Sequence, residues 1–298
     1  MISRRDKSRE GFALITVVAI IGLLAAVGGM TALQARISAV DARADHDQAR
    51  MRAAIEGAAW RAELALNHED EARRWQPDGR LYTIQADDIA LRIRPLAVNG
   101  RYDLNAGDSE VLQRLLGELG VGLGQASSIA TALEDWRDED SDPGLGGGEA
   151  SAYLGAGLAP PGDRPLVARE EFRNVLGVDA EIFAAARLYL TVDSGDLNPA
   201  FAPPALQRAM DLSGGGLSRI TSARQSGRPA VDQDGNPAFD PSPSARYALL
   251  IEAETEAGAF MAVEIEITSA GDGEPMRIVR RSPLARNEAG LLFDETSR

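Results

Sequence analysis

The sequence predicts an α+β protein with a long N-terminal transmembrane helix, a small antiparallel sheet and an all-α domain inserted into that sheet. Three observations lead to this prediction. An uncharged apolar run follows a short basic leader, strand-like alternation occurs in two separate stretches, and helix-like patterns fill the chain between them. With 44% apolar and 26% charged residues, the 298-residue chain can bury a core and is unlike a disordered protein.

The first element expected is a helix over residues 12–68, preceded by a leader at 1–11. Residues 12–35 carry no charge. As a helix they would span roughly 36 Å, more than the roughly 30 Å hydrocarbon core of a bilayer. The run is longer than the apolar region of a secretory signal peptide, so a retained span is favoured over a cleaved signal. The basic residues of the leader would keep the N-terminus cytoplasmic.

The remaining elements follow from local patterns in the exported part. Strands are expected at 69–100, where apolar residues alternate on both sides of a turn at Asp87 and Asp88. An all-helical domain is expected at 101–212, where Asp108 and Asp179 are placed to cap helices. The rest of the chain divides into a loop at 213–245, strands at 246–283 and a tail at 284–298, which is expected to lack structure.

One face of the C-terminal strands is expected to lie in solvent. In the stretch 263–267, Glu264 and Glu266 alternate with three β-branched apolar residues. Successive side chains of a strand point to opposite faces. The alternation therefore predicts a strand with one buried and one solvated face.

Charge and residue usage exclude several classes of function. Acids outnumber bases 45 to 31, giving a net charge of -14, which is the opposite of what a nucleic-acid-binding protein needs. The lack of cysteine excludes disulfides, thiolate metal sites and a cysteine nucleophile. A membrane-anchored hydrolase with paired carboxylates is a weak alternative, because nothing in the pattern positions an acid beside a base. No catalytic site is predicted.

The candidate metal site is an acidic loop that comprises residues 134–142 and continues to Glu149. Six carboxylates in nine positions repel one another unless water screens them or a cation binds. Over 138–149, carboxylates fall at positions 1, 3, 5 and 12 of a calcium-binding loop, although Pro143 stands where that loop has glycine. Calcium is thus the one cofactor expected, a solvated loop is the alternative, and the choice of ligands stays open. The candidate ligands are Asp135, Asp138, Asp140, Asp142 and Glu149.

The junction of leader and apolar run, REGFALIT at 9–16, resembles the processing site of type IV pilins and pseudopilins. In that family a prepilin peptidase cuts after the glycine and methylates the new N-terminal residue, which implies cleavage between Gly11 and Phe12. Most members have glutamate at the fifth mature position, where this chain has Thr16. The glutamate compensates the buried N-terminal amine of a neighbouring subunit. Its absence implies a subunit that sits first, at the tip of the fibre.

The order of the elements resembles the type II secretion system protein K family of large minor pseudopilins. The segments that carry the resemblance are NGRYDLN at 99–105, DWRDED at 135–140, EEFRNVLG at 170–177, LTV at 190–192 and DLN at 196–198. Pro199 stands where the family usually has threonine. The resemblance implies a pseudopilin-type sheet with an inserted SAM-like, helix-hairpin-helix domain. It also agrees with a calcium site, because calcium has been associated with the helical domain of that family.

The resemblance implies an assembly protein rather than an enzyme. Such a protein would cross the bacterial inner membrane once, with its bulk in the periplasm, and help to initiate the pseudopilus and to export folded proteins across the outer membrane. The implied partners are other minor pseudopilins in a tip complex, the major pseudopilin, the prepilin peptidase and secreted cargo, with no nucleic acid. A minor pilin of a type IV pilus, acting in adhesion or DNA uptake, is the alternative.

Overall fold

The computed structural model describes residues 7–70, 72–138, 148–195, 197–210, 212, 215–226, 231, 239, 244–269 and 276–293. The chain divides into two compact units. The first ends at Ala53 and the second begins at Ala54.

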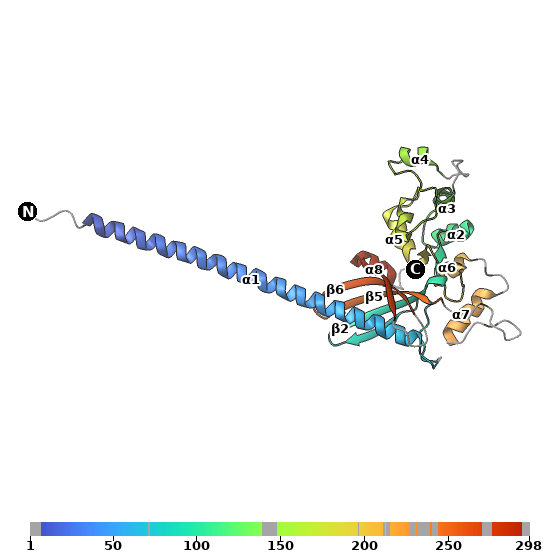
Figure 1. The fold of residues 1–298 in the computed structure, drawn as a ribbon, viewed down its shortest axis with the longest axis horizontal. Coiled ribbons are helices and arrows are strands. Elements are labelled where there is room, and N and C mark those ends of the chain that lie inside the picture. The colour runs from blue at the N-terminus through green and yellow to red at the C-terminus, as the bar shows by residue number, and fades with distance from the viewer. Residues whose placement is uncertain are drawn as a thin grey trace, which may run out of the picture. The chain divides into compact units, whose positions relative to one another are not determined.

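The first unit consists of the greater part of helix α1, Lys7–Leu66 (Figure 1). Its sequence holds no proline, so no backbone donor is missing along its length. Large apolar side chains from Val17 to Val40 are exposed all round the helix. A helix that is apolar on every side suits a lipid environment. Among the described residues, α1 is the one helix that is long and apolar enough to cross a membrane, judged by length and composition.

The second unit is built on a five-stranded antiparallel sheet with the strand order β1-β2-β5-β6-β7. The strands are β1 Tyr82–Ala86, β2 Ile89–Ala97, β5 Arg246–Thr255, β6 Phe260–Thr268 and β7 Arg277–Leu284. Strands β2 and β5 pair directly although they are far apart in the sequence. The segment between them is therefore an insertion into the sheet, which is the α+β arrangement predicted.

The insertion is mainly helical. Its helices are α2 Ser109–Glu118, α3 Leu123–Arg137, α4 Ala150–Gly155, α5 Ala180–Ala186, α6 Pro204–Ala209 and α7 Gly216–Ser226, with the 3-10 helices η1 Val98–Gly100, η2 Arg169–Asn174 and η3 Arg187–Tyr189. A short parallel pair, β3 Tyr102–Asp103 and β4 Leu190–Thr191, joins its first and later parts. The caps expected at Asp108 and Asp179 are confirmed, because their carboxylates accept hydrogen bonds from the N–H groups of Glu110 and Ile182 at 2.7 and 2.8 Å.

The last turns of α1 cover one face of the sheet (Figure 1). Their buried stripe consists of Ile55, Ala58, Ala59, Ala62 and Leu66. Arg281 on β7 donates to the carboxylate of Glu56 on α1 at 3.2 Å. Arg281 lies opposite Ile265 in the register of β7 with β6, so the two share a face. The face that carries Ile265 is therefore the one against α1.

The insertion and helix α8, Arg286–Phe293, cover the other face of the sheet. Leu96, Ala248 and Leu250 of the sheet belong to the same hydrophobic core as the helices of the insertion. Ala289 of α8 is fully buried in this core. The sheet thus lies between two helical layers, and its second face carries those helices of the insertion that share this core.

This second face corrects the prediction made for β6. The alternation at 263–267 predicts that Glu264 and Glu266 face solvent, and this is wrong. Glu264 is only 3% exposed, and the side chain of Glu266 is 14% exposed. The pattern of the strand is the same whether its polar side meets water or meets basic side chains from another part of the chain. Here it meets arginines of the insertion.

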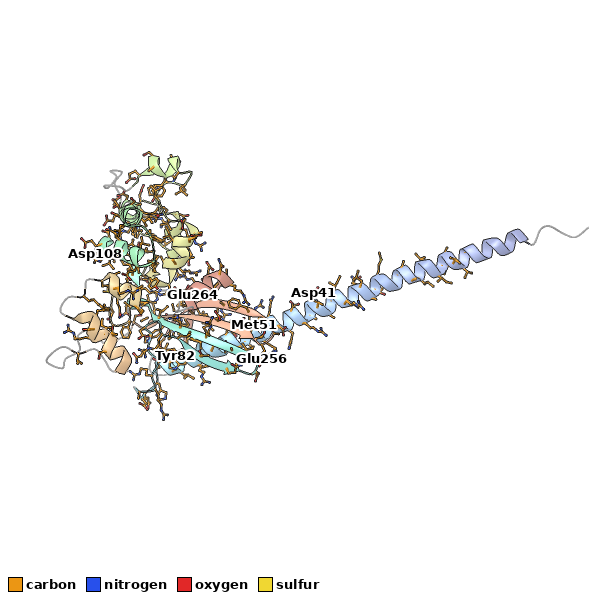
Figure 2. The ribbon with its side chains drawn as sticks, turned by 180° about the vertical axis from the view of Figure 1, so that it is seen from behind. Asp41, Met51, Tyr82, Asp108, Glu256 and Glu264 are labelled. Carbon is orange, nitrogen blue, oxygen red and sulfur yellow. The ribbon has the colours of Figure 1, made fainter. Side chains whose placement is uncertain are left out.

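Three buried arginines hold the carboxylate of Glu264, which Figure 2 places where the strands meet the helices of the insertion. Arg101 donates from Nη1 to Oε1 at 3.0 Å. Arg169 donates to both carboxylate oxygens at 2.8 Å. Arg187 donates from Nη2 to Oε2 at 3.3 Å. Arg101 lies just before β3, Arg169 is the first residue of η2, and Arg187 is the first residue of η3. Three separate segments of the insertion therefore meet at one carboxylate.

A ring of more exposed charges surrounds this centre. Arg280 on β7 donates to Glu170 at 2.9 Å and to Glu266 at 2.8 Å. Glu288 on α8 pairs with Arg187 at 3.3 Å. We call the four central residues and this ring the Glu264 network. It ties β6, β7 and α8 to the 3-10 helices η2 and η3 of the insertion.

The titration of Glu264 follows from its surroundings. Burial alone would raise the pKa of its carboxyl group, but the charges of Arg169 and Arg101, together with the hydrogen bonds from Arg169, hold that pKa well below the ordinary 4.5. The carboxylate is therefore ionised throughout the neutral range. Because the pKa is lowered on folding, its contribution to stability is present above about pH 4.5 and is lost as the pH falls through the lowered value.

Two helices lie where a loop and an unstructured tail are predicted. Helix α7 falls within 213–245, and Ile220 on it is 1% exposed. Helix α8 falls within 284–298. The first stretch is rich in glycine, serine and proline, and the second is short, so local pattern gives little sign of either helix. Both owe their burial to contacts made in the folded chain.

Replacing the central carboxylate, Glu264→Gln, leaves three buried arginines without their shared anion. We expect the thermal unfolding midpoint of the detergent-solubilised chain to fall by roughly 10 °C, because removing one partner of a buried ion pair costs about 3–5 kcal/mol. The matched control is Glu256→Gln, an exposed carboxylate just after β5 (Figure 2), which should shift the midpoint by no more than about 2 °C. Equal shifts in the two variants would contradict the role given to Glu264.

Candidate functional site

The residues expected at the processing site lie near the start of α1. Gly11 and Phe12 both fall within the helix, which begins at Lys7. Thr16 is an exposed residue one turn further along. The candidate bond thus lies at the junction of the leader and the apolar run. Its cleavage and the methylation of Phe12 stay predictions.

The described carboxylates of the acidic segment stand at its two ends. Asp135 is buried in the last turn of α3, where it is 3% exposed. Asp138 follows α3 as its C-terminal cap residue, and Glu149 immediately precedes α4. Asp140 and Asp142 lie outside the described residues. The structure therefore places three of the five candidate ligands.

Two of these carboxylates act on one buried tyrosine. Tyr153 on α4 is fully buried, its ring centroid lies 5.9 Å from that of Trp136, and its hydroxyl oxygen accepts a hydrogen bond from the N–H of Leu176 at 3.1 Å. Burial raises the pKa of Tyr153, the N–H of Leu176 lowers it, and the charges of Asp135 and Glu149 raise it further. Asp135 and Glu149 therefore approach the same part of the insertion from opposite ends of the acidic segment.

The described carboxylates do not by themselves complete a metal site. Within the described part of the chain, no three His, Asp or Glu side chains are grouped so that they could hold an ion. The donor chemistry suits calcium, which takes about six to eight oxygen ligands. A site here would need further oxygens from residues 139–147. The calcium site accordingly stays a prediction.

A polar clamp formed by Asp103 and Asn105 closes the base of the insertion. The carboxylate of Asp103 accepts hydrogen bonds from the N–H groups of Asn105 and Ser194, both at 2.8 Å. The side chain of Asn105 accepts from the N–H of Leu166 at 2.8 Å and donates to the carbonyl oxygens of Leu166 and Val192 at 2.9 and 3.0 Å. The polar clamp therefore joins three segments that are distant in sequence, and its role is structural.

The related motif at 196–198 lies between β4 and α6, and its Asp196 is outside the described residues. The N–H of Asn198 donates to the carbonyl oxygen of Asn99 at 2.7 Å. The side-chain oxygen of Asn99 accepts from the N–H of Ser244 at 3.2 Å. Asn99 thus links the segment after β4 to the chain that enters β5.

Sequence reasoning missed the Glu264 network. A signal was present in the motifs rather than in the strand pattern. Arg101 lies within the motif at 99–105, and Arg169 immediately precedes the one at 170–177. Both arginines are about 1% exposed, which is rare for so polar a side chain. The motifs therefore mark the segments that meet at the junction of insertion and sheet.

Comparison with known proteins identifies relatives through this same region. Residues 92–194 match the sequence model of the family described as type II secretion system (T2SS), protein K. The chain is 34% identical over 84 residues to type II secretion system protein K of Dickeya chrysanthemi, covering 28% of this chain and 23% of that protein. It is 30% identical over 131 residues to the Klebsiella pneumoniae protein of that name, covering 39% and 40%. The alignments thus span less than half the length of either relative.

The fold is also similar to that of a chain in a crystal structure of the GspK-GspI-GspJ complex from the enterotoxigenic Escherichia coli type 2 secretion system. The TM-score is 0.53, with 14% identity over 82% of this chain and 99% of that chain. At this identity the likeness shows a shared fold, and the N-terminal apolar helix is consistent with a membrane anchor. The matched insertion, the two partial alignments and the shared fold together show that this chain is similar to type II secretion system protein K in its inserted region and in its architecture.

Proposed function

We propose that this chain is a minor pseudopilin at the tip of the type II secretion pseudopilus. There it helps to initiate assembly of the fibre and to export folded proteins across the outer membrane. The observation that carries this proposal is the family-matched insertion, residues 92–194, which packs on an antiparallel sheet in a chain that also has the long apolar helix α1. A role in assembly requires surfaces of fixed shape and does not require a catalysed reaction.

The proposed location is the inner membrane, crossed once by α1. The exposed apolar side chains of the first unit support a lipid-embedded helix. The basic leader supports a cytoplasmic N-terminus, because positive residues near a span favour that side. The second unit is then periplasmic.

The proposed place at the tip rests on Thr16. A subunit that docks behind another must neutralise the N-terminal amine of that neighbour inside an apolar fibre core, and threonine carries no charge with which to do so. A subunit that stands first has no neighbour ahead of it to neutralise. Thr16 therefore suits the leading position.

The proposed partners are the other minor pseudopilins of the tip complex. A structurally similar chain comes from a complex of GspK, GspI and GspJ, which supports assembly of this chain with the corresponding subunits. The major pseudopilin, the prepilin peptidase and secreted cargo are the further partners expected from this role. No nucleic-acid partner is proposed, since the net charge of -14 disfavours phosphate binding.

Calcium is the proposed cofactor of the acidic segment. Asp135 and Glu149 both lie close enough to Tyr153 for their charges to raise its pKa, and Asp138, Asp140 and Asp142 lie between them in the sequence. These residues supply the hard oxygen donors that calcium prefers, and the bound ion would neutralise a self-repelling loop. The bound ion would order residues 134–149 and would not take part in a reaction.

The substitution Gly11→Val tests the proposed function. We expect the variant to keep its leader and to be lost from the co-purified tip complex, because a branched side chain beside the scissile bond should block the peptidase. Intact mass measurement and affinity purification from membranes give the two readings. The control Gly22→Val lies in the same apolar run, where an added Cβ meets nothing within 4 Å, and should be processed normally. Normal processing of Gly11→Val, or co-purification of the unaltered chain with pilus subunits instead, would overturn the proposal.

Calcium should raise the thermal unfolding midpoint of the detergent-solubilised chain. The double variant Asp140→Asn, Asp142→Asn should lose this response, because it removes two of the proposed ligands. The control Asp87→Asn changes an exposed turn residue with a φ of 53°, which asparagine adopts as readily, and should keep the response. A calorimetric titration that finds no binding at about millimolar calcium would rule out the site.

A further inference from the structure

Glu63 is a second buried carboxylate, and it lies on the opposite face of the sheet from Glu264. It belongs to the last turn of α1 and is 9% exposed. Its Oε1 accepts hydrogen bonds from the hydroxyl of Ser269 at 3.1 Å and from the side chain of Asn67 at 3.5 Å. Its Oε2 is buried and has no donor among the residues that the structure describes. Half of this carboxylate is therefore without a hydrogen bond.

The face of the sheet that covers Glu63 offers it no free cation. Ser269 lies two residues beyond Ile267 on β6, so its side chain is on the face against α1. Among the described residues of the five strands, Arg281 is the one cation on this face. It already pairs with Glu56 at 3.2 Å. When Glu63 is ionised, its charge thus faces a surface that brings no counter-charge.

Tyr247 on β5 and Arg74, in the segment after α1, are the ionisable neighbours of this carboxylate. Burial raises the pKa of Tyr247, the charge of Glu63 raises it further, and the charge of Arg74 lowers it. The hydroxyl of Tyr247 is therefore neutral and supplies no charge. The guanidinium of Arg74 donates to the carbonyl oxygens of His68 and Glu69 at 2.9 and 3.5 Å. Its hydrogen bonds are thus made to the backbone and not to Glu63.

The two buried carboxylates respond to folding in opposite directions. Burial raises the pKa of Glu63 above the ordinary 4.5, and the hydrogen bond from Ser269 lowers it by a smaller amount. Arginines hold the pKa of Glu264 well below 4.5. Because the pKa of Glu63 is raised on folding, the stability that is present below about pH 4.5 is lost as the pH rises through the raised value.

We propose that Glu63 makes the contact between the last turn of α1 and the sheet sensitive to pH. The contact is strongest while this carboxyl group is protonated, and it weakens once the group ionises, because a charge without a counter-charge is then buried there. Ser269 directly follows β6, and α1 ends at Leu66, so the end of the long helix is the part that loosens. This pH dependence is a property of the folded chain and does not depend on the proposed role in secretion.

The substitution Glu63→Gln tests the proposal through thermal unfolding of the detergent-solubilised full chain at about pH 5 and about pH 8. Glutamine can still accept the hydrogen bond of Ser269, but it cannot ionise. At the higher pH the midpoint of the variant should lie about 2–4 °C above that of the natural chain, with a smaller difference at the lower pH. The control Glu69→Gln, an exposed carboxylate just beyond α1, should shift the midpoint by no more than about 1 °C. A midpoint of Glu63→Gln at or below that of the natural chain at the higher pH would overturn the proposal.

Amide hydrogen exchange in the natural chain gives a local reading that needs no variant. After correction for the intrinsic pH dependence of exchange, the protection of residues 60–67 should fall severalfold between the lower and the higher pH. Glu63→Gln should remove this fall. His68→Gln, which replaces the imidazole just after this turn, should keep it. Equal protection at the two pH values in the natural chain, or a fall that depends on His68 instead, would contradict the role given to Glu63.

Discussion

The burial of one carboxylate, Glu264, among three arginines is the interaction on which the arrangement of the second unit depends. The arginines come from three separate segments of the insertion, and the carboxylate comes from a central strand of the sheet. Neither side is stable when buried alone, because an uncompensated charge in the interior is expensive. The sheet and the insertion therefore fold as interdependent parts, and the outer ring of charges extends this dependence to β7 and α8.

The same interaction explains how the mainly helical insertion would serve the proposed role in assembly. The polar clamp of Asp103 and Asn105 closes the insertion at its base, and the Glu264 network fixes that base on the sheet. The opposite face of the sheet is occupied by the last turns of α1. Surfaces on the insertion and on the sheet are thus presented in one arrangement, as recognition by neighbouring subunits requires. The acidic segment lies in the insertion, so an ion bound there would order a local surface without altering this base.

Local patterns were enough to predict the apolar helix, the hairpin of β1 and β2, and the caps at Asp108 and Asp179, since each depends on neighbouring residues. The face of Glu264 could not be predicted, because what covers a strand is decided by residues far away in the sequence. Helices α7 and α8 were missed for the same reason. The processing site at Gly11 and Phe12 stays a prediction, because its cleavage needs a peptidase. The calcium ligands also stay a prediction, because two of them lie outside the described residues.

The central claim is that Glu264 fixes the insertion on the sheet, and a distance measurement tests it most directly. The chain has no cysteine, so spin labels can be placed at two introduced cysteines alone, Thr83→Cys on β1 and Ser127→Cys on α3, both at exposed positions. Pulsed electron paramagnetic resonance of the detergent-solubilised chain should give one narrow distance, which broadens when Glu264→Gln is added. A broad distribution in the chain with its natural Glu264, or a narrow one that is unchanged in the glutamine variant, would contradict the account.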